Sequence, residues 1–423
     1  MKIEIPYGRK QVTVDIPDKN VLDIVKKEKV KSIEDEQKIV LNALRNPVAS
    51  KSLRELSKDK RNAVILVSDI TRPCPSYKFL PFIVDELEMA GINDFSILFG
   101  LGIHRSQTDE EKRILVGDYV CSKARRLIDS NQGEYKLVGT TTAGTPIEVS
   151  EFTLETDLLI ATANIEYHYF AGYSGGAKSV LPGICSRKTI EANHSMMFDN
   201  KSVTGNLKDN PVRQDIEEAG HTVGIDFLFN VILDDEKRVI AAVSGKNDEA
   251  YLRGIELYSS LFEKIIDEKA DIVITSPGGY PKDINLYQAQ KAMDNVKEIV
   301  KENCEIILVA SCEEGYGEKV FEEWMAGVQD YKKLNAQIRE KFQVGGHKAV
   351  AISKLLSERR VLLYSCFSQA ETERMGFFKV SSLQAYLDKR IKAEPDLKII
   401  LVPGGSFVQF QGISPGDAET ISQ

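Results

Sequence analysis

The sequence has no pair of cysteines at the C-x-x-C spacing on which zinc clusters and dithiol redox motifs depend. Six cysteines are spread along the 423 residues, and we expect them to be reduced and mostly structural. A surplus of positive charge is absent as well, because 63 acidic against 55 basic residues give a net charge of −8. Little would attract a polyanion, so nucleic acid is not expected as a partner.

Long apolar runs are also missing. No stretch reaches the ~18 consecutive apolar residues of a membrane span. The opening segment MKIEIPYGRK alternates instead of forming the apolar part of a signal peptide, and we expect a cytoplasmic protein that does not enter a membrane. What the sequence does contain is core material, since 42% of its 423 residues are apolar. This composition favours a globular chain of two or three domains.

Apolar runs of strand length alternate with longer segments of helical period, which is typical of α/β domains built from βαβ units. The runs are apolar on both faces, as a largely parallel sheet covered by helices requires. The predicted strands are 63–68, 95–100, 157–163, 271–275, 305–310, 360–364 and 397–402. The predicted helices are 76–90, 107–116, 187–198, 247–265, 285–301, 331–342 and 382–391.

Two α/β domains are expected, because a charged segment near residues 262–270 closes one helix and a new strand with a glycine turn follows it. The first domain would span residues 1–265 and the second residues 266–408. A C-terminal tail of about residues 409–423 would pack back on the first domain.

Ligands of open α/β sheets gather at the carboxyl ends of the strands, so the turns after the apolar runs are candidate sites. The first turn, SDITRP, offers Asp69, Thr71 and Arg72. The guanidinium could clamp a carboxylate or phosphate, or pair with the acid inside a capped loop. The second turn, GLGIHR, begins like a dinucleotide fingerprint, but Arg105 stands at the third glycine. His104 in this turn is either a general acid/base or a solvated or core histidine.

The third turn, NIEYHYFAGYSGGAKS, comes close to a P-loop but has Ala177 where the glycine before the lysine belongs, which weakens a kinase or NTPase interpretation. Its backbone amides can still cradle an anion. His168 lies ten residues before Lys178, and His194 follows sixteen residues after it in TIEANH. His194 is either a core-edge histidine or a metal ligand.

The fourth turn, SPGGYP, leads into LYQAQKA, where Gln288 and Lys291 share a helix face because they are three residues apart. Plain solvent exposure is the alternative for such a face. From the residues alone, an anionic small molecule is the predicted ligand, and the participation of a metal stays open.

Together these segments resemble the lactate racemase family, the nickel-pincer-nucleotide-dependent racemases of 2-hydroxyacids. EYHYFAGYSGGAKSVLPG and the histidine in TIEANH match the family's strongest motif. SDITRP, GLGIHR and LYQAQKA match its other site segments in order. The resemblance covers nearly the whole chain, and it implies that the active site lies in a cleft between two α/β domains.

The resemblance also implies a cofactor, a pyridinium-3-thioamide-5-thiocarboxylic acid mononucleotide that holds nickel through two sulfurs and a ring carbon. Lys178 matches the lysine that carries this nucleotide covalently, and His194 matches the histidine that completes the nickel coordination. One protein ligand is enough where the cofactor supplies three. The residues that match cofactor-binding positions are Asp69, Ile70, Thr71, Arg72, Ser174, Gly175 and Gly176.

By the same resemblance, His104 and His168 are the two acid/base residues, one for the hydroxyl of each enantiomer. The α-hydride would pass to the cofactor and return to the opposite face of a planar 2-oxoacid. The positions that match contacts to the substrate are Arg72, Tyr287, Gln288 and Lys291.

The sequence departs from the lactate-type pattern at Tyr167, which precedes the base histidine where proline is usual. Relatives within the family act on lactate, malate, 2-hydroxyglutarate, longer 2-hydroxyacids or sugar acids, so the substrate stays open within this class. The resemblance implies cofactor-synthesis enzymes as maturation partners. The alternative from another class is a non-catalytic module that binds a nucleotide or an organic acid, which would need neither paired histidines nor nickel.

Overall fold

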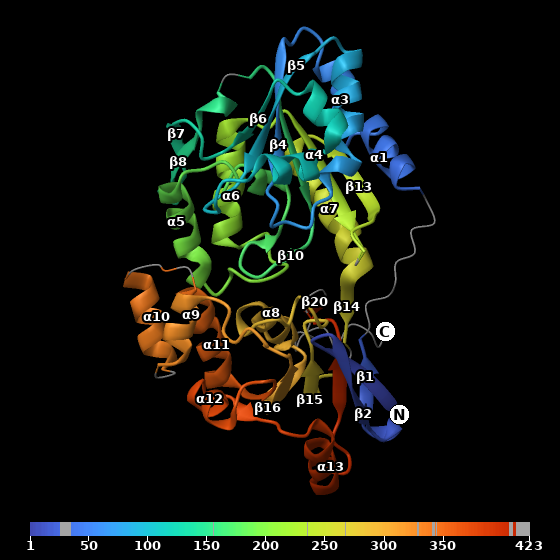
Figure 1. Ribbon diagram of the computed structural model, residues 1–423, viewed down its shortest axis with the longest axis vertical. Helices are drawn as coiled ribbons and strands as arrows, with labels where there is room; N and C mark the ends of the chain where they lie inside the picture. The colour runs from blue at the N-terminus through green and yellow to red at the C-terminus, as the bar shows by residue number, and fades with distance from the viewer. Residues whose placement is uncertain are drawn as a thin grey trace, which may run out of the picture. The chain divides into compact units, whose positions relative to one another are not determined.

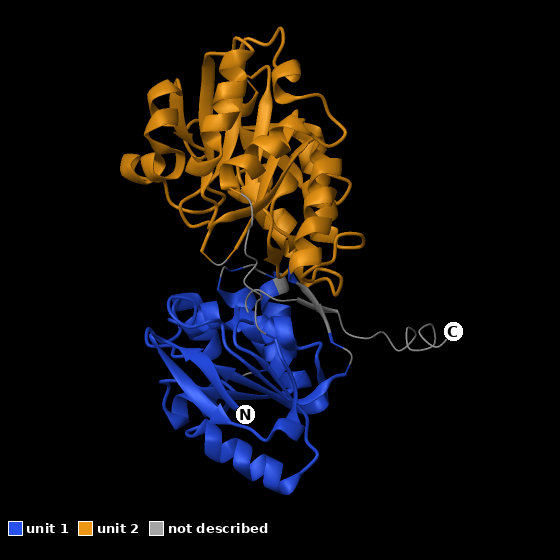
Figure 2. Cartoon of the chain, turned by 90° about the vertical axis from the view of Figure 1, so that its right-hand side faces the viewer, with its two compact units in different colours: residues 1–28, 262–423 blue, residues 29–261 orange. Residues whose placement is uncertain are grey.

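The computed structural model describes residues 1–25, 35–154, 156–234, 236–266, 268–327, 330–340, 343, 345–405 and 409–411. The chain divides into two compact units (Figure 2). Unit 1 comprises Met1–Glu28 and Phe262–Gln423, and unit 2 comprises Lys29–Leu261. Each unit is an α/β structure, as predicted. Within the described part of the chain, no helix combines the length and the apolar character needed to cross a membrane.

Unit 2 is built on a six-stranded sheet. In spatial order its strands are β13 (Val239–Gly245), β12 (Phe227–Leu233), β9 (Leu159–Asn164), β4 (Asn62–Ser68), β5 (Asp94–Gly100) and β6 (Arg126–Asp129) (Figure 1). β13 runs antiparallel to β12, and all other neighbours are parallel. The inner strands β4, β5 and β9 are buried almost throughout, as a parallel sheet with both faces covered requires.

Several helices of unit 2 begin at side chains that cap their free backbone N–H groups. Thr108 and Glu111 form a capping box at one such start, Ser186 caps another, and Asn210 precedes Pro211 at a third. The helices are α1 (Glu36–Arg45), α2 (Leu53–Leu56), α3 (Leu80–Met89), α4 (Asp109–Lys123), α5 (Arg187–Ser195), α6 (Pro211–Val223) and α7 (Asn247–Phe262). Two antiparallel hairpins join them, β7 (Tyr135–Thr140) with β8 (Pro146–Ser150) and β10 (Tyr167–His168) with β11 (Gly172–Tyr173).

Unit 1 holds a second six-stranded sheet, in which all neighbouring strands are parallel. In spatial order its strands are β18 (Phe378–Lys379), β17 (Arg360–Tyr364), β16 (Val300–Val309), β15 (Ala270–Thr275), β19 (Ile399–Val402) and β3 (Val21–Ile24). Its helices are α8 (Leu286–Val296), α9 (Lys319–Met325), α10 (Tyr331–Glu340), α11 (Gly346–Glu358), α12 (Gln369–Arg374) and α13 (Leu383–Ala393). A hairpin of β1 (Lys2–Tyr7) and β2 (Lys10–Asp15) and a parallel pair of β14 (Glu263–Ile265) and β20 (Gln409–Gln411) complete it.

The N-terminal segment belongs to unit 1, whereas the sequence pattern placed it in a first domain of residues 1–265. Ile3, Ile5 and Val14 of the β1–β2 hairpin are buried in one apolar cluster with Ile272 and Leu401, and β3 pairs with β19. A lone hairpin is marginally stable in water, so it must bury its apolar face on a larger sheet. The alternating sequence identifies that face but not the sheet that receives it.

All predicted strands overlap observed strands, but two predicted helices are too long. The helix predicted over 247–265 ends at Phe262, because the next three residues form β14. The helix predicted over 285–301 ends at Val296, because β16 starts at Val300. In both places a charged segment that fits the helical period continues as extended chain, since it pairs with another strand.

Two predictions fall partly outside the described residues. One is the end of the helix predicted over 331–342, of which residues 341 and 342 are not described. The other is the tail of residues 409–423, of which 412–423 are not described. The described part of this tail, β20, pairs with β14 within unit 1.

Candidate active site

The candidate site lies where the strand order of unit 2 reverses. Starting from β4, the chain adds β5 and β6 on one side and later places β9 on the other. The carboxyl ends of β4 and β9 therefore flank a topological switch point, which is where open α/β sheets bind ligands. Three of the four predicted site turns follow Ser68, Gly100 and Asn164, the last residues of β4, β5 and β9.

The side chain of Asp69 holds the turn after β4. Its Oδ1 accepts a hydrogen bond from the Thr71 backbone N–H at 2.7 Å, and its Oδ2 lies 3.7 Å from Arg72 Nε. Gln107 supports the same turn, because its Oε1 accepts a hydrogen bond from the Ile70 backbone N–H at 2.8 Å. Arg72 is half exposed while Asp69 is only 3% exposed. The ion pair of a capped loop is thus present, and the guanidinium still reaches solvent.

His104, from the turn after β5, is hydrogen-bonded to Asp69. Its Nδ1 lies 3.2 Å from Asp69 Oδ2 and 3.4 Å from Thr71 Oγ1. An ionised carboxylate can only accept, so Nδ1 donates and the lone pair stays on Nε2. Burial alone would raise the pKa of Asp69, but the bonds from His104 and Thr71 and the charge of Arg72 hold this pKa below its usual value. Asp69 is therefore an anion at neutral pH that can stabilise a protonated His104.

His168 lies on the short hairpin that follows β9. Its Nδ1 accepts a hydrogen bond from the Ala171 backbone N–H at 3.3 Å, so in the neutral ring the hydrogen sits on Nε2. His104 and His168 are thus held in opposite tautomers, one with an accepting and the other with a donating Nε2. The neighbouring Tyr167 packs against Tyr173 across the hairpin, with ring centroids 5.1 Å apart.

The glycine-rich loop turns sharply before Lys178. Gly175 and Gly176 have φ angles of +80° and +59°, a region in which other residues are strained. The loop is fixed from behind, because Asn230 Oδ1 accepts a hydrogen bond from the Gly176 N–H at 2.9 Å. Ser174 ties the loop to β9, since its Oγ donates to the carbonyl of Asn164 at 2.8 Å.

The amine of Lys178 is enclosed by protein atoms, although the side chain keeps some exposed surface. It lies 5.6 Å from the centroid of the Phe170 ring. Burial, together with the charges of Arg72 and Arg213, holds the pKa of this amine well below its usual value. A desolvated lysine beside other cations is deprotonated more readily and becomes a nucleophile.

His194 lies near the end of α5. Its Nδ1 is 3.1 Å from Asn193 Oδ1, and its ring meets the ring of Phe170 edge-on with centroids 4.9 Å apart. The ring of His168 meets the same phenyl ring at 4.6 Å. Phe170 is therefore a common neighbour of His168, Lys178 and His194, and it brings three of the predicted functional side chains together.

Among the described residues, no group of three or more His, Cys, Asp and Glu side chains is arranged to hold a metal ion. A metal at His194 would therefore need most of its donors from a bound cofactor or solvent. Nickel accepts imidazole nitrogen readily and tolerates a planar set of mixed donors.

The other predicted substrate residues lie on α8 in unit 1. Asn285 caps this helix, and its side chain accepts a hydrogen bond from the Gln288 N–H at 3.0 Å. Lys348 donates to the carbonyl of Tyr287 at 2.6 Å, and its amine lies 3.8 Å from the centroid of the Tyr287 ring. Gln288 and Lys291 are exposed.

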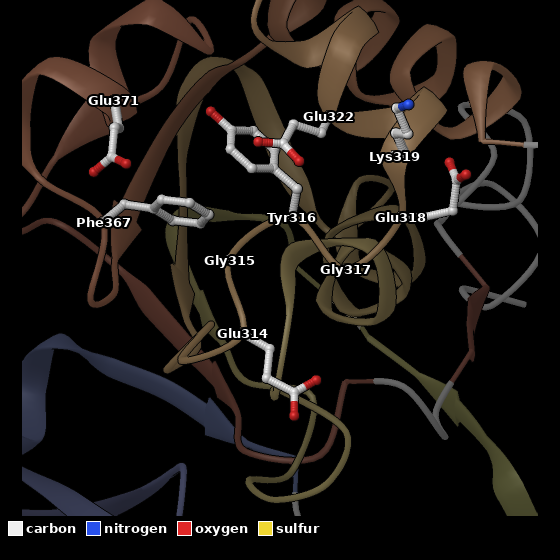
Figure 3. Close-up of a pocket in the computed structure, with 9 residues that line it drawn as sticks. All are labelled: Glu314, Gly315, Tyr316, Gly317, Glu318, Lys319, Glu322, Phe367 and Glu371. Atoms are coloured by element: carbon white, nitrogen blue, oxygen red, sulfur yellow. The ribbon is translucent and has the colours of Figure 1, made fainter.

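A cavity of about 470 Å³ lies beside the start of α8 (Figure 3). The carbonyls of Gly315 and Tyr316 on its wall accept hydrogen bonds from the first N–H groups of α8. Four carboxylates and one lysine line it, so it suits an anionic substrate poorly. The lining residues are Glu314, Gly315, Tyr316, Gly317, Glu318, Lys319, Glu322, Phe367 and Glu371.

Comparison with known proteins decides the family. Residues 7–205 match the lactate racemase N-terminal domain, and residues 265–409 match the lactate racemase C-terminal domain. The chain is 34% identical over 372 residues to the lactate racemase of Thermoanaerobacterium thermosaccharolyticum, an alignment that covers 85% of this chain and 87% of that protein. The chain belongs to the lactate racemase family.

A second relative and one solved structure agree with this assignment, and a second solved structure shares the fold. The lactate racemase of Lactiplantibacillus plantarum is 36% identical over 339 residues, which are 78% of this chain and 80% of that protein. The lactate racemase apoprotein from T. thermosaccharolyticum has a TM-score of 0.88 at 32% identity and covers 97% of this chain and 100% of its own. A Thermotoga maritima protein, 19% identical with a TM-score of 0.62, covers 90% of this chain and 99% of its own and shares the fold. As a member of the lactate racemase family, the protein is an isomerase, a racemase.

The sequence pattern did not reveal the residues that support the candidate site through hydrogen bonds and ring contacts. Phe170 stood within the family motif, but nothing in the spacing marked it as the shared neighbour of the functional groups. Asn193 bonds to the residue that follows it, a relation that no helix-face periodicity predicts. Gln107, Asn230 and Arg213 come from distant segments, and only the folded chain brings them to the site.

Proposed function

We propose that the protein is a nickel-dependent racemase or epimerase of a 2-hydroxyacid, with a nickel-pincer nucleotide bound covalently to Lys178. The observation that carries the proposal is the grouping of His168, Lys178 and His194 around the ring of Phe170. A nucleophilic amine, an imidazole ligand and an acid/base imidazole are the groups that such a cofactor and its substrate require within one site.

The residues present fit a pincer nucleotide. Lys178 has an amine whose pKa lies well below its usual value, which suits a covalent link through nitrogen. His194 directs a hydrogen-bond donor at Asn193 and so keeps its Nε2 lone pair for nickel. The turned amides around Gly176 and the charge of Arg72 favour a phosphate. When bound, the cofactor would supply the hydride acceptor that amino-acid side chains lack.

His104 and His168 would serve as the paired acid/base groups. His104 Nε2 accepts the hydroxyl proton of one enantiomer, and Asp69 stabilises the imidazolium that results. His168 holds a proton on Nε2 and would serve the opposite enantiomer. Two groups are needed because a racemase must approach the stereocentre from both sides. The hydride route is favoured because an α-hydrogen beside an ionised carboxylate is too weakly acidic for imidazole to remove.

We assign the substrate carboxylate to Arg72. The planar guanidinium can bind a carboxylate through two parallel hydrogen bonds, and Tyr287, Gln288 and Lys291 are the matching residues of unit 1. Lactate is the default substrate, because the curated relatives are lactate racemases. A pocket discriminates by only ~1–3 kcal/mol per methylene, so we expect several short 2-hydroxyacids to be turned over.

The test is expression of the chain with and without cofactor-synthesis enzymes, as wild type and as Lys178→Arg. Intact-mass analysis should show an adduct, accompanied by nickel, only in the co-expressed wild type. Chiral chromatography with a panel of enantiopure 2-hydroxyacids should show racemisation by this sample alone. A metal-free, unmodified but fully active protein would contradict the proposal. A co-expressed protein that carries neither adduct nor nickel and racemises no member of the panel would favour the non-catalytic binding module instead.

A further inference from the structure

Three buried polar side chains stand in line behind His194. Asn193 is 0% exposed, Asp215 is 2% exposed and Thr141 is 4% exposed. They come from α5, from α6 and from the turn between β7 and β8, elements that lie side by side in unit 2 (Figure 1). Thr141 Oγ1 donates to Asp215 Oδ1, Asp215 Oδ2 accepts from Asn193 Nδ2 at 2.8 Å, and Asn193 Oδ1 lies 3.1 Å from His194 Nδ1. Hydrogen bonds in such a buried chain polarise one another, so a change at one side chain affects the hydrogen bonds of the others.

The direction of each hydrogen bond follows from chemistry. Asn193 Nδ2 faces two groups that can only accept, the Asp215 carboxylate and the Val212 carbonyl, the latter at 3.1 Å. The amide nitrogen must therefore point at these acceptors, which leaves the amide oxygen towards His194. An amide oxygen can only accept, so His194 Nδ1 must donate. The neutral ring is thereby fixed with its lone pair on Nε2.

We propose that Asn193 and Asp215 are positioning residues that hold His194 in the metal-binding tautomer. A histidine that ligates a metal usually donates its other ring N–H to a carboxylate or carbonyl, which fixes the ring and makes the ligating nitrogen more basic. Here an amide stands between the ring and the carboxylate. Asp215 polarises the amide of Asn193, and the amide oxygen becomes a stronger acceptor for His194. The assignment of nickel as the metal rests on the proposed function, but the tautomer does not.

A variant in which Asn193 and Asp215 exchange their residue types distinguishes the positioning role from a role in packing alone. In Asn193→Asp combined with Asp215→Asn, the carboxylate faces His194 and the new amide donates to it, so the ring still meets an acceptor. In Asn193→Ala, the helix is kept because alanine is a good helix former, but the acceptor is gone. Glu191→Gln is the matched control, because Glu191 lies exposed on the same helix and pairs with Arg187 at 3.8 Å.

The first measurement uses the full chain without cofactor. The chain has five histidines, so long-range ¹⁵N–¹H spectra of histidine-labelled protein are simple, and His194→Gln identifies the signal of His194. We expect a protonated Nδ1 and an unprotonated Nε2 in the wild type, the exchange variant and the control, and a mixture of tautomers in Asn193→Ala. A wild-type His194 with its hydrogen on Nε2 would overturn the proposal without need of any variant. An unchanged tautomer in Asn193→Ala would overturn it as well.

The second measurement uses protein co-expressed with the cofactor-synthesis enzymes. Nickel competition with a chelator should show an apparent affinity about 10- to 100-fold lower in Asn193→Ala, the usual effect of removing a partner behind a metal ligand. The exchange variant should recover most of this loss, and the mass of the Lys178 adduct should be the same in all samples. Equal nickel affinity in Asn193→Ala and wild type would overturn the metal role of Asn193. A wild type that carries neither adduct nor nickel would contradict the proposed function, whereas the tautomer result would still decide the positioning role.

Discussion

The buried carboxylate of Asp69 and the partly exposed imidazole of His104 form a pair, with Oδ2 3.2 Å from Nδ1. The other oxygen of Asp69 accepts a hydrogen bond from the Thr71 N–H at 2.7 Å. Each of the two donors, His104 Nδ1 and the Thr71 N–H, needs an acceptor, and the two carboxylate oxygens of Asp69 accept one hydrogen bond each. Asp69, from the turn after β4, therefore fixes His104 in the tautomer with its hydrogen on Nδ1.

Asp69→Asn should invert this tautomer. The new Oδ1 must accept from the Thr71 N–H, so Nδ2 would donate to His104 and force the ring hydrogen onto Nε2. The base would lose its lone pair, and we expect kcat to fall about 10²- to 10⁴-fold, the upper figure being that of the same change in a serine protease triad. Steady-state kinetics of cofactor-loaded protein, with the Lys178 adduct checked by mass, is the measurement. Asp109→Asn at the start of α4 is the control, and a wild-type kcat in Asp69→Asn would refute the role given to the pair.

His104→Ala and His168→Ala should each sharply lower the rate of racemisation and leave the cofactor adduct in place. Because two enantiomers have equal free energy, the ratio of forward to reverse kcat/KM is fixed, and both directions must be lost together in each variant. The losses expected for removing an acid/base group are about 10²- to 10⁴-fold. His221→Ala serves as the control, because His221 is exposed and paired with Asp248 at 2.6 Å. Retained activity in both site variants would rule out the two-base scheme.

Seven of the twelve strands of the two sheets could be predicted, because burial on both faces leaves uninterrupted apolar runs, as in β4 and β17. β12 was not predicted, because Asn230 lies in the middle of its apolar run. This asparagine is fully buried, and its side chain bonds to Gly176, so a polar residue that looks misplaced in the sequence is required by the fold. The position of β3 in the second sheet was not predicted for another reason, since its partner β19 lies near the other end of the chain. Pairing at such separation is decided by the whole sheet and not by a local pattern.

The candidate site could be predicted down to its strand ends, because the carboxyl ends of parallel strands share one edge. The turns that carry Asp69, His104 and His168 follow from this rule. The orientation of the side chains could not be predicted, because a tautomer depends on which atom of a neighbour faces the ring. The backbone N–H of Ala171 decides this for His168, and the amide of Asn193 decides it for His194.

Lys178→Met should stabilise unit 2 at neutral pH. The folded chain holds the pKa of this amine well below its usual value, so the unfolded chain binds more protons and wild-type stability rises as pH approaches the unfolded pKa of about 10.4. Methionine removes that cost. We expect a higher melting temperature at pH 7, by about 2–4 °C for each kcal/mol of this cost in a unit of this size, and a difference that shrinks towards pH ~10.

Thermal denaturation of cofactor-free protein at both pH values is the measurement for this lysine. Lys208→Met is the control, because Lys208 is exposed in the same unit. If Lys178→Met were less stable than the wild type at pH 7, the amine would have to be a stabilising ammonium and not the nucleophile proposed here.

Phe170→Leu should damage the site more than the fold. Phe170 is 5% exposed, and leucine keeps its apolar character but loses the flat ring that meets His168 and His194. We expect a loss of about 1–2 kcal/mol in the free energy of unfolding, together with lower nickel retention and a lower kcat. Phe82→Leu is the control, because it removes a ring from the apolar core of the same unit. Equal kinetic effects of both substitutions would mean that Phe170 acts only through packing.

Lys348→Met tests whether α8 takes part in substrate binding. Lys348 is 4% exposed, its amine donates to the Tyr287 carbonyl at 2.6 Å and it lies 3.8 Å from the Tyr287 ring centroid. Methionine fills a similar volume without a donor, so the carbonyl and the ring lose the group that fixes them. The loss of one hydrogen bond of about 1 kcal/mol and of the contact with the ring should raise KM about 10-fold. We expect little change in kcat or in the Lys178 adduct, since Tyr287 is proposed to hold the substrate and not to move its protons.

Lys354→Met, at an exposed position of the same helix α11, is the control. An unchanged KM in Lys348→Met, beside an intact fold, would exclude Tyr287 as a substrate contact and leave Arg72 to bind the carboxylate.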